Sequence, residues 1–444
     1  MDMSMSTFRG GVHPPEGKAG TEHKAVEDMR LPAVVVIPLQ QHTGAPCVPT
    51  VAVGDMVRVG QLVGDAPSPI SAPVHASISG KVVAIEPRPH PALPRPVPAV
   101  VIETDGQSDG APSVSPSGGA GWDRLEPADL LARIRAAGLV GLGGAAFPTH
   151  VKLSPPKGKS IDTLIINGVE CEPYLTADHR LMIERPMDII DGIRVLRKIL
   201  GVERVCLGIE RNKPDAIALM TDRCRESGEP IEVFPLAVKY PQGAEKQLIK
   251  ALLGREVPSG GLPFDVGVVV QNVGTAAAVA DAILRSRPLI SRVVTVGGDG
   301  IKDPRNLRVR IGTLFSEVIA ACGGYAVDGP VKLVMGGPMM GLAQYTANVP
   351  VVKGTSGILV FRHRPRDARP SACVRCGRCV EICPMGLVPH RIAEYADLDK
   401  FALAEEFGVK DCIECGACVY TCGSRRPLVH LIRYAKLNLG KKKA

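Results

Sequence analysis

Apolar and polar residues alternate over short stretches in the first part of the chain. Residues 34–38 form a β-branched run, and residues 51–63 and 70–83 each alternate around a turn. A period of two is typical of strands that bury one face, so we expect a small β module over residues 31–105. The preceding residues 1–30 are polar and contain Gly and Pro, and they predict an extended arm.

The two halves of this module resemble the barrel-sandwich fold of biotinyl and lipoyl carrier domains. Such carriers present a lysine on a hairpin, where this chain has Val74, His75 and Ala76. The module is therefore predicted to be a scaffold and not a swinging arm. We interpret His75 as a structural residue, because a lone histidine in a turn more often packs than binds a ligand.

The pattern changes after a Gly/Ser/Pro-rich linker at residues 106–121. Residues 129–137 read as a helix, and the apolar runs 163–166 and 266–270 read as buried strands. Each run leads into a polar turn, and the carboxyl ends of strands are where α/β proteins bind ligands. Residues 122–290 are therefore predicted to form an α/β domain with a site for an anionic cofactor.

A glycine-rich loop at residues 138–152 strengthens that prediction. Glycines let backbone N–H groups approach a phosphate or a flavin, and Lys152 adds a positive charge. The loop is neither a Walker loop nor a dinucleotide fingerprint, so alone it is a weak signal. Further along, residues 292–298 and 331–338 predict strands that end in Gly pairs, with a helix at 314–322 between them.

Eight of the 13 cysteines form two copies of one pattern, Cys-x2-Cys-x2-Cys-x3-Cys, in which equivalent positions are 39 residues apart. This spacing predicts two [4Fe-4S] clusters, because three closely spaced thiolates bind one cluster and the fourth reaches the other. The first predicted set is Cys373, Cys376, Cys379 and Cys422. The second predicted set is Cys383, Cys412, Cys415 and Cys418.

Disulfides and zinc are the alternative uses of these cysteines. A chain of 444 residues can bury a large core without disulfides, and zinc ribbons usually pair two Cys-x2-Cys knuckles instead. The two copies differ after their last cysteine, where the first has Pro384 and the second has Gly423, but neither residue is a ligand. Cys47, Cys206, Cys224 and Cys322 lack partner spacing and are interpreted as ordinary thiols, and we ascribe the position of Cys171 to packing.

Composition narrows the classes of function. The formal charge is +8, and residues 362–444 hold 16 Lys and Arg against 9 Asp and Glu, so most of the excess lies around the cysteines. Basic residues there compensate anionic clusters and attract an acidic electron carrier. Aromatic residues are only 4%, which argues against a nucleic-acid surface. The most apolar run, at 266–280, is too short and too polar for a bilayer.

Three segments together resemble the FMN- and NADH-binding fold of the flavoprotein subunit of respiratory complex I. They are the glycine loop with its Phe-Pro-Thr and Lys152, the Asn-x-x-Glu-x-Glu-Pro turn from Asn167, and the Asn-Val-x-Thr turn from Asn272. With residues 8–15, 41–46, 167–180 and the double cysteine motif, nearly the whole chain resembles the family of C subunits of Rnf-type ion-translocating oxidoreductases.

The resemblance implies roles for individual residues. Residues matching flavin contacts or neighbours are Gly141, Gly143, Gly144, Lys152, Asn167, Glu170, Tyr240, Gly243, Glu245, Asn272 and Thr275. Phe147 matches the aromatic beside the nicotinamide, and Glu172 a nucleotide-ribose contact. The chain departs from the complex I pattern at Leu142, where that loop carries Arg, and at Ala244, where it carries an acidic residue.

The resemblance also implies the architecture and the partners. The expected fold is multidomain α/β and α+β: an arm at 1–30, a barrel-sandwich at 31–105, a linker at 106–121, an FMN/NADH domain at 122–290, a soluble-ligand-binding β-grasp domain at 291–361, a ferredoxin-like domain at 362–436 and a basic tail at 437–444. Expected partners are NAD(H), the membrane subunits of the complex and its ferredoxin-like subunit. The expected location is peripheral, on the cytoplasmic face of the bacterial inner membrane, where the basic ferredoxin-like end docks.

The implied activity is electron transfer between NAD(H) and ferredoxin, coupled to translocation of Na⁺ or H⁺. No nucleophile or acid–base pair is needed, because FMN exchanges two electrons with the nicotinamide and one at a time with clusters. Na⁺ and H⁺ both stay open, as does the direction of electron flow. Two alternatives also remain: a cobalamin-reducing flavoprotein of bacterial microcompartments, and an electron-wire or docking subunit without flavin.

Overall fold

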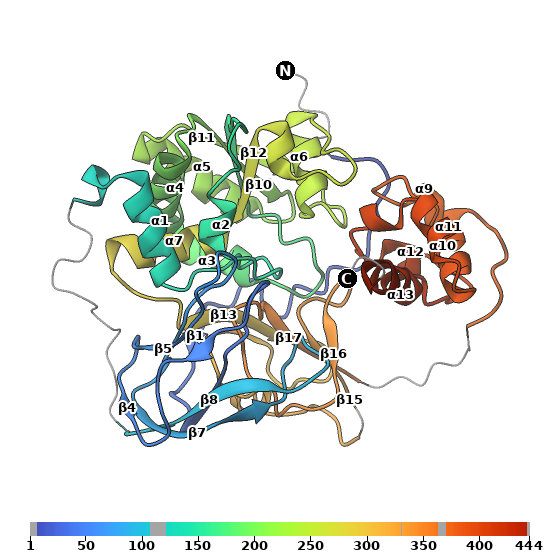
Figure 1. Ribbon diagram of the computed structural model, residues 1–444. Helices are drawn as coiled ribbons and strands as arrows, with labels where there is room; N and C mark the ends of the chain where they lie inside the picture. Colours follow the sequence, from blue (N-terminus) through green and yellow to red (C-terminus); the bar gives the residue numbers. More distant parts are fainter. Residues whose placement is uncertain (1–6, 107–120, 330, 363–369, 442–444) are drawn as a thin grey trace.

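The computed structural model describes residues 7–106, 121–329, 331–362 and 370–441, which form three sheet-containing regions and one helical region (Figure 1). Two small antiparallel sheets make the N-terminal module. The first has the order β2–β8–β7–β4 and the second β3–β5–β6. Their strands are β2 (Val34–Pro38), β3 (Val48–Pro49), β4 (Met56–Val57), β5 (Leu62–Asp65), β6 (Val74–His75), β7 (Gly80–Arg88) and β8 (Val97–Thr104).

The apolar side chains of these strands close on one another, as the alternating sequence predicts. Val35, Ile37, Val63, Val82 and Val100 are fully buried in one cluster. His75 at the hairpin position is buried too, and burial lowers its pKa to about 3. A neutral, enclosed imidazole is consistent with the structural interpretation of His75.

The α/β region has a parallel sheet in the order β11–β10–β9–β12. Its strands are β9 (Thr163–Asn167), β10 (Arg204–Glu210), β11 (Ile231–Leu236) and β12 (Val268–Asn272). The apolar run expected at 266–270 starts its strand later, because residues 263–266 form the 3-10 turn η2 (Pro263–Val266). The surrounding elements are η1 (Trp122–Arg124), α1 (Pro127–Ala136), α2 (Thr149–Lys152), α3 (Ala177–Glu184), α4 (Pro186–Leu200), α5 (Pro214–Ser227), α6 (Glu245–Leu253) and α7 (Val273–Leu284).

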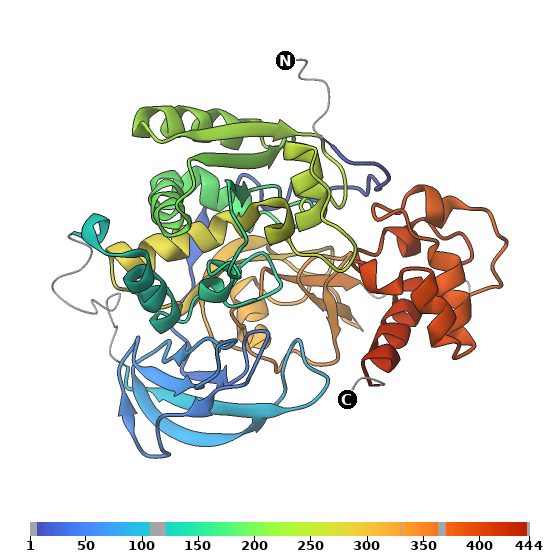
Figure 2. The ribbon, with the colours of Figure 1, turned by 45° about the horizontal axis from the view of Figure 1, so that its top comes forward.

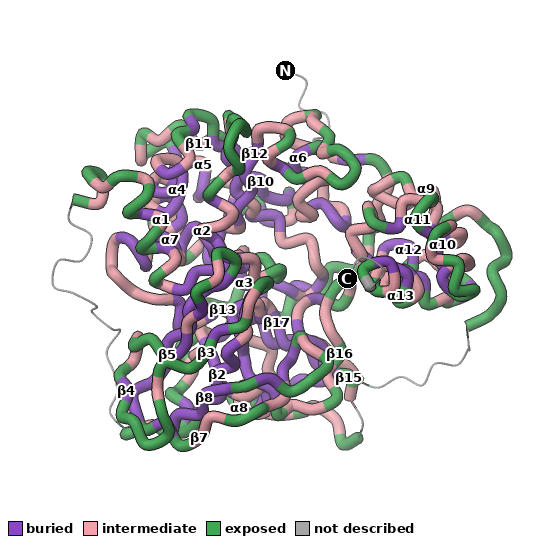
Figure 3. Tube along the Cα trace, in the orientation of Figure 1, coloured by how far each residue is buried: buried purple, intermediate pink, exposed green. Residues whose placement is uncertain are grey.

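Helices α4 and α7 pack so closely that only glycine fits at their crossing. A Cβ on Gly192 would lie 1.8 Å from the carbonyl oxygen of Ala276. Their apolar faces, together with α1 and β9, form the largest buried cluster among the described residues. Buried residues are purple in Figure 3, and these elements lie in the upper half of that view. This packing holds the carboxyl ends of β9 and β12 in fixed positions.

A six-stranded mixed sheet follows, in the order β1–β14–β13–β17–β15–β16. Its strands are β1 (Val26–Asp28), β13 (Ser291–Gly297), β14 (Arg305–Arg310), β15 (Val331–Met335), β16 (Leu342–Gln344) and β17 (Gly357–Arg362), with helix α8 (Phe315–Ala321). Strand β1 comes from the predicted arm and pairs in parallel with β14. The arm is therefore an edge strand as well as an extended segment.

The C-terminal region is helical and lies to one side of the molecule (Figure 2). It contains α9 (Arg378–Glu381), α10 (Pro389–Asp397), α11 (Phe401–Glu406), η3 (Val409–Asp411), α12 (Ala417–Tyr420) and α13 (Leu428–Lys441). No helix within the described ranges combines the length and the apolar character that a bilayer span requires.

The N-terminal arm connects this region to the rest. Gly11 N donates to the carbonyl oxygen of Ile382 at 2.8 Å, and Val12 pairs with Tyr240 through two backbone hydrogen bonds. Gly10 and Gly11 have φ of 81° and 83°, and a Cβ on either would lie within 2.8 Å of a carbonyl oxygen of Ile382 or Tyr240. The glycine pair is required because the arm passes between two backbones.

Candidate functional site

Asn167 and Asn272 lie opposite each other at the carboxyl ends of β9 and β12. The strand order reverses here, because the chain runs from β9 to β10 on one side and returns as β12 on the other. Asn272 Nδ2 lies 3.4 Å from the Asn167 carbonyl oxygen, and Asn167 Nδ2 donates to the Gly243 carbonyl oxygen at 2.9 Å. Open α/β sheets bind ligands at such a reversal. The structure thus brings three predicted flavin segments together.

The glycine loop is folded back onto this crevice. Gly141 N donates to the Phe147 carbonyl oxygen at 2.8 Å, which closes the loop on itself. Leu142 N donates to Thr275 Oγ1 at 2.9 Å, which ties the loop to the first turn of α7. Phe147 is half-buried beside the loop. The turn from Asn272 to Thr275 therefore positions the glycine loop, and both are segments predicted to contact the flavin.

The tip of the loop leaves room for a planar group. Gly143 and Gly144 are exposed, and a Cβ on Gly143 would lie 3.5 Å from the Cβ of Asn272. A Cβ on Gly144, whose φ is 112°, would meet nothing within 4 Å. Backbone N–H groups bordering open space, next to two asparagines, fit the polar edge and phosphate of FMN. The residues present therefore fit this cofactor.

Lys152 faces Glu245 across the crevice. Its Nζ lies 2.5 Å from Glu245 Oε1, with the side chains 27% and 37% exposed. Glu245 is the first residue of α6, where a carboxylate is favoured by the helix dipole. A partly exposed cation beside the glycine loop suits a phosphate group, and Glu245 is its counter-ion.

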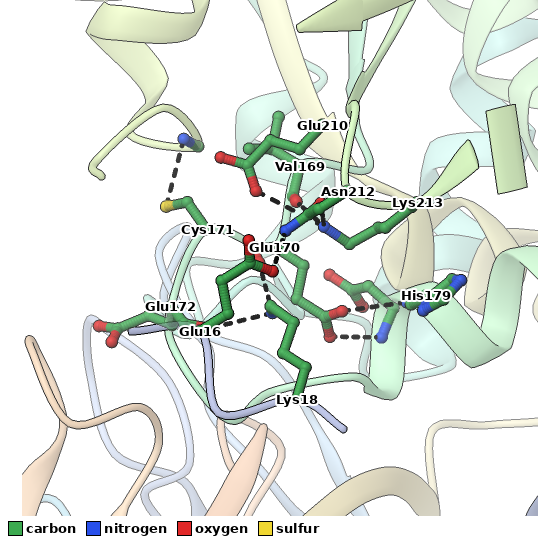
Figure 4. A network of polar contacts seen from close by, with 12 residues as sticks. Glu16, Lys18, Val169, Glu170, Cys171, Glu172, His179, Glu210, Asn212 and Lys213 are labelled. Atoms are coloured by element: carbon green, nitrogen blue, oxygen red, sulfur yellow. Dashed lines mark hydrogen bonds and ion pairs between the residues drawn. The ribbon is translucent and has the colours of Figure 1, made fainter. Parts of the chain in front are cut away.

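The turn that follows β9 is held by a lysine of the N-terminal arm (Figure 4). Lys18 Nζ donates to three backbone carbonyl oxygens: Glu170 at 2.9 Å, Glu172 at 3.1 Å, and Leu175. Lys18 is 5% exposed, and burial lowers its pKa. Three acceptors satisfy all three of its N–H groups, so the ammonium fixes the path of the turn.

A second buried lysine holds the start of the same turn. Lys213 Nζ donates to the Val169 carbonyl oxygen at 2.8 Å and lies 3.5 Å from Glu210 Oε2. Neither lysine was predicted from the sequence, because single lysines in a polar arm and at a helix start carry no motif. Only the fold places them on carbonyl groups that are more than 40 residues away in the chain.

Glu170 lies within the crevice region but is engaged with the protein. Its carboxylate accepts from the backbone N–H groups of Asp178 at 2.7 Å and His179 at 3.2 Å, at the start of α3. Its own φ is 48°, a left-handed conformation. Burial, and then the Glu170 charge, hold the pKa of Asp178 well above its usual range. The predicted flavin role of Glu170 stays a prediction, and its described contacts shape the turn.

Glu172 reaches from the turn to the six-stranded sheet. It accepts from the N–H groups of Met339 at 3.0 Å and Met340 at 2.8 Å. Burial raises its pKa to about 7, although the two N–H donors oppose this. Gly337 is close as well, since a Cβ there would lie 2.3 Å from Glu172 Oε2. Glu172 thus sits where the α/β fold meets the β-grasp sheet.

Tyr240 links the flavin segment to the cysteine-rich region. Its ring is buried, and its hydroxyl donates to the Cys415 carbonyl oxygen at 2.6 Å. Nearby, Gly243 N donates to Cys171 Sγ at 3.3 Å. Burial raises the pKa of Cys171 strongly, so this thiol is neutral and packed. The burial and the backbone contact support the interpretation of Cys171 as a packing residue.

The eight repeated cysteines separate into two groups of four. One cavity is lined by Cys383, Cys412, Cys415 and Cys418, together with apolar side chains such as Val429 and Ile432. Another is lined by Cys373, Cys376, Cys379 and Cys422. These are the two crossed sets expected from the spacing.

The two cavities have different surroundings. The second set is enclosed: Cys415 and Cys418 are buried, and a Cβ on Gly416 would lie 2.8 Å from the Met339 carbonyl oxygen. The first set is open, since Cys373 and Cys376 are exposed. Its walls include three arginines, Arg375, Arg378 and Arg426. The second set therefore faces Tyr240 of the α/β fold and Met339 beside the six-stranded sheet, and the first faces solvent.

Each set of four cysteines surrounds a cavity, as ligands at the corners of a cubane cluster do. The donor sets therefore fit [4Fe-4S] clusters, each of which takes four thiolates.

Comparison with known protein families divides the chain in the same order. Residues 6–107 match the RnfC barrel sandwich hybrid domain, and residues 134–281 match the Nuo51 FMN-binding domain. Residues 293–343 match the SLBB domain, and residues 367–423 match the 4Fe-4S dicluster domain. These matches confirm the predicted fold class and the predictions of FMN and iron–sulfur clusters.

Several relatives are similar over nearly the whole of this chain. The C subunit of the proton-translocating ferredoxin:NAD(+) oxidoreductase complex of Clostridium ljungdahlii is 48% identical over 97% of this chain and 94% of its own. The C subunit of the Na(+)-translocating complex of Acetobacterium woodii is 47% identical over 98% of each chain. That of the ion-translocating oxidoreductase complex of Rhodobacter capsulatus is 44% identical over 99% of this chain and 84% of its own. The chain therefore belongs to the family of C subunits of the Rnf-type ion-translocating ferredoxin:NAD(+) oxidoreductase complexes.

Proposed function

We propose that this chain carries electrons between NAD(H) and a ferredoxin-like subunit within a membrane complex that translocates Na⁺ or H⁺. The named relatives differ in the ion, so both ions stay open. The observation that supports this role best is the contact between Tyr240 and Cys415, which joins the flavin crevice to the second cysteine set. When bound, FMN would exchange a hydride with the nicotinamide and single electrons with the clusters.

In this proposal, the residues of the crevice bind the flavin and orient it. The glycine loop and Lys152 hold the phosphate side of the flavin, and Asn167 and Asn272 hold its position over the ends of β9 and β12. Lys18 keeps the turn in place, and Glu172 lies at the border where a nicotinamide nucleotide would enter. No acid–base residue is required, because the cofactors supply the chemistry.

The cysteine sets have an order in the proposed route. Cys383, Cys412, Cys415 and Cys418 hold the cluster nearest the flavin, because this set contacts Tyr240 and is enclosed. Cys373, Cys376, Cys379 and Cys422 hold the outer cluster, because two of these cysteines are exposed. The outer cluster would then exchange electrons with the partner subunit.

The surface around the outer set suits an acidic partner. Arg375, Arg378 and Arg426 line that cavity, and the cysteine-rich region carries most of the excess positive charge. Exposed charges guide association and are screened over about 10 Å at 0.1 M salt. We therefore place the docking face at the ferredoxin-like end, with the protein peripheral on the cytoplasmic face of the membrane.

Reduction of the purified protein by NADH tests the proposal. The chain is prepared anaerobically, its FMN, iron and sulfide are measured, and NADH is added while cluster signals are followed by EPR. We expect bound FMN, about eight iron and eight sulfide, and cluster reduction that depends on FMN. Clusters without flavin, or clusters that NADH leaves oxidised, would refute this role and support the flavin-free electron-wire alternative.

A variant pair tests the order of the route. Cys376→Ser should impair transfer to an external acceptor while NADH still reduces the inner cluster. Cys415→Ser should block reduction of the outer cluster by NADH. If Cys415→Ser left outer-cluster reduction unchanged, the proposed order would be wrong.

A further inference from the structure

A cavity of about 590 Å³ lies between the α/β fold and the β-grasp sheet. Its walls come from α3 and α7 on one side and from β1, β13 and β14 on the other. None of the residues predicted to contact FMN lines it, although Leu142 and Gly274 are adjacent to such residues in sequence. The volume falls in the range of small-molecule pockets, which is roughly 300–1,000 Å³.

The walls of this cavity carry an excess of positive charge. Five arginines line it against three aspartates. The arginines are Arg185, Arg287, Arg292, Arg308 and Arg310, and the aspartates are Asp28, Asp178 and Asp281. Arg185 Nη2 lies 3.0 Å from Asp281, and Arg308 Nη1 lies 2.8 Å from Asp28. The excess of arginine over aspartate in the walls favours an anion.

Arg292 is the innermost of these residues. It is 6% exposed, and its Nη2 donates to the Leu142 carbonyl oxygen at 3.1 Å. Its Nε and Nη1 have no hydrogen-bond partner among the described residues. Burial lowers its pKa to about 10, while the nearby Asp178 raises it. A buried donor without an acceptor is costly, so this residue of the cavity wall has two N–H groups that an acceptor would satisfy.

Arg287 supplies a second guanidinium at the same cavity. It is half-buried, and no ion pair to it is found within the described part of the chain. It lies in the segment that joins α7 to β13, so it comes from a different element than Arg292. Two guanidinium groups from separate elements are the arrangement that holds phosphate or carboxylate oxygens.

We propose that this cavity binds a small organic anion with phosphate or carboxylate groups, held by Arg292 from within and by Arg287 at the connection to β13. The planar fork of each arginine presents paired N–H groups to the oxygens. The same Arg292 side chain holds Leu142 of the glycine loop, so a bound anion would also fix the guanidinium that supports the flavin crevice. This site is separate from the proposed positions of FMN and NAD(H).

Calorimetric titration of the full chain with FMN and clusters bound tests the site. The probes are pyrophosphate, ADP and citrate, which separate phosphate, nucleotide and carboxylate chemistry. We expect one-to-one binding of at least one probe, and weakening of about tenfold or more in Arg287→Glu, since a charge-assisted hydrogen bond contributes about that much. Arg225→Glu, an arginine on α5 that is 74% exposed, is the matched control and should bind like the wild type.

FMN retention and reduction by NADH, measured on Arg287→Glu, distinguish a failure of this proposal from a failure of the proposed function. Arg287→Glu should retain FMN and should still be reduced by NADH, because Arg287 does not line the flavin crevice. ADP could also bind where the dinucleotide does, and only binding that Arg287→Glu weakens counts for the cavity. Absence of binding by all three probes, or equal binding by the wild type and Arg287→Glu, would overturn the proposal.

Discussion

The hydroxyl of Tyr240 donates a 2.6 Å hydrogen bond to the backbone carbonyl oxygen of Cys415. The two residues are 175 positions apart in sequence. The bond joins a segment predicted to contact flavin to a cysteine predicted to bind a cluster, inside an apolar contact that includes Val12 and Ala417. This buried contact is a short connection between the two proposed cofactor positions.

Tyr240→Phe should preserve both clusters but shift the potential of the inner one to a more negative value. The hydroxyl draws electron density from the Cys415 peptide, and hydrogen bonds near a cluster tune its potential. The unsatisfied carbonyl oxygen should also cost about 1–3 kcal/mol of stability. Redox titration by EPR measures the potential. Tyr434→Phe, an exposed tyrosine on α13 bonded to Asp399, is the control; equal potentials in both variants would contradict the prediction.

Lys18→Met should loosen the turn after β9, because three carbonyl oxygens lose their common donor. We expect weaker FMN retention and a higher KM for NADH, with less effect on kcat once FMN is restored. Lys24→Met is the matched control: it lies in the same arm, and its side chain is 45% exposed. FMN content after gel filtration and steady-state kinetics measure the effect. Equal retention in the two variants would show that the arm does not organise the site.

Cys383→Ala should remove the cluster that the set beginning at Cys412 holds, and should leave the other cluster in place. The cavity that contains Cys383 also contains Cys412, whereas Cys379 lies in the other cavity. Cys322→Ala is the control, because this buried thiol belongs to neither set. Iron content and EPR of anaerobic protein distinguish the clusters. A Cys383→Ala protein that keeps both EPR signals would disprove the crossed assignment.

The Lys152–Glu245 pair predicts opposite effects of two substitutions on flavin binding. Lys152→Ala removes the cation at the crevice and leaves Glu245 as an unpaired negative charge, so FMN should bind at least about tenfold more weakly. Glu245→Gln leaves Lys152 without its counter-ion, so FMN should bind as well as or better than in the wild type. Fluorescence titration of flavin-depleted protein gives both constants. Similar losses in both variants would assign the pair a structural role only.

Local sequence patterns were sufficient to predict the parts of the structure that depend on residues close together in the chain. The cysteine spacing describes a loop that folds on itself, so both sets could be predicted before the fold was known. The run at 34–38 and the helix near 314–322 were likewise predicted within a residue of their observed bounds. Partners distant in sequence could not be predicted in this way.

Lys18, Arg292 and Tyr240 illustrate the part that sequence reasoning could not reach. Lys18 contacts carbonyl groups more than 150 residues away, and nothing in its own neighbourhood marks it. Arg292 lies at the start of a predicted strand, and only the fold brings its guanidinium to the glycine loop, where Nη2 donates to the Leu142 carbonyl oxygen. Tyr240 was predicted from resemblance as a flavin contact, yet its hydroxyl bonds to the cysteine-rich region. Tertiary packing decides the role in all three cases.

Lys353 predicts a pH dependence of stability. Its amino group is buried at the junction of three regions, where Nζ donates to the carbonyl oxygens of Pro73 at 2.5 Å and Gly138 at 2.7 Å. Burial lowers its pKa from the ordinary 10.5 to about 7. Between these two values the unfolded chain binds a proton that the folded chain does not. Unfolding then takes up a proton, so stability from this residue rises with pH, by at most about 1.4 kcal/mol per pH unit.

Lys353→Met should remove this dependence, because methionine does not titrate. The difference in unfolding free energy between wild type and variant should therefore grow in favour of the wild type from pH 7 to pH 9, by about 1–3 kcal/mol. Other groups titrate in both proteins and cancel in the comparison. Urea unfolding at pH 6.5, 7.5 and 9, read from the single tryptophan, Trp122, measures it. A difference that stays constant across this range would mean that Lys353 keeps its proton in the folded protein, and that the carbonyl groups around it compensate for its burial.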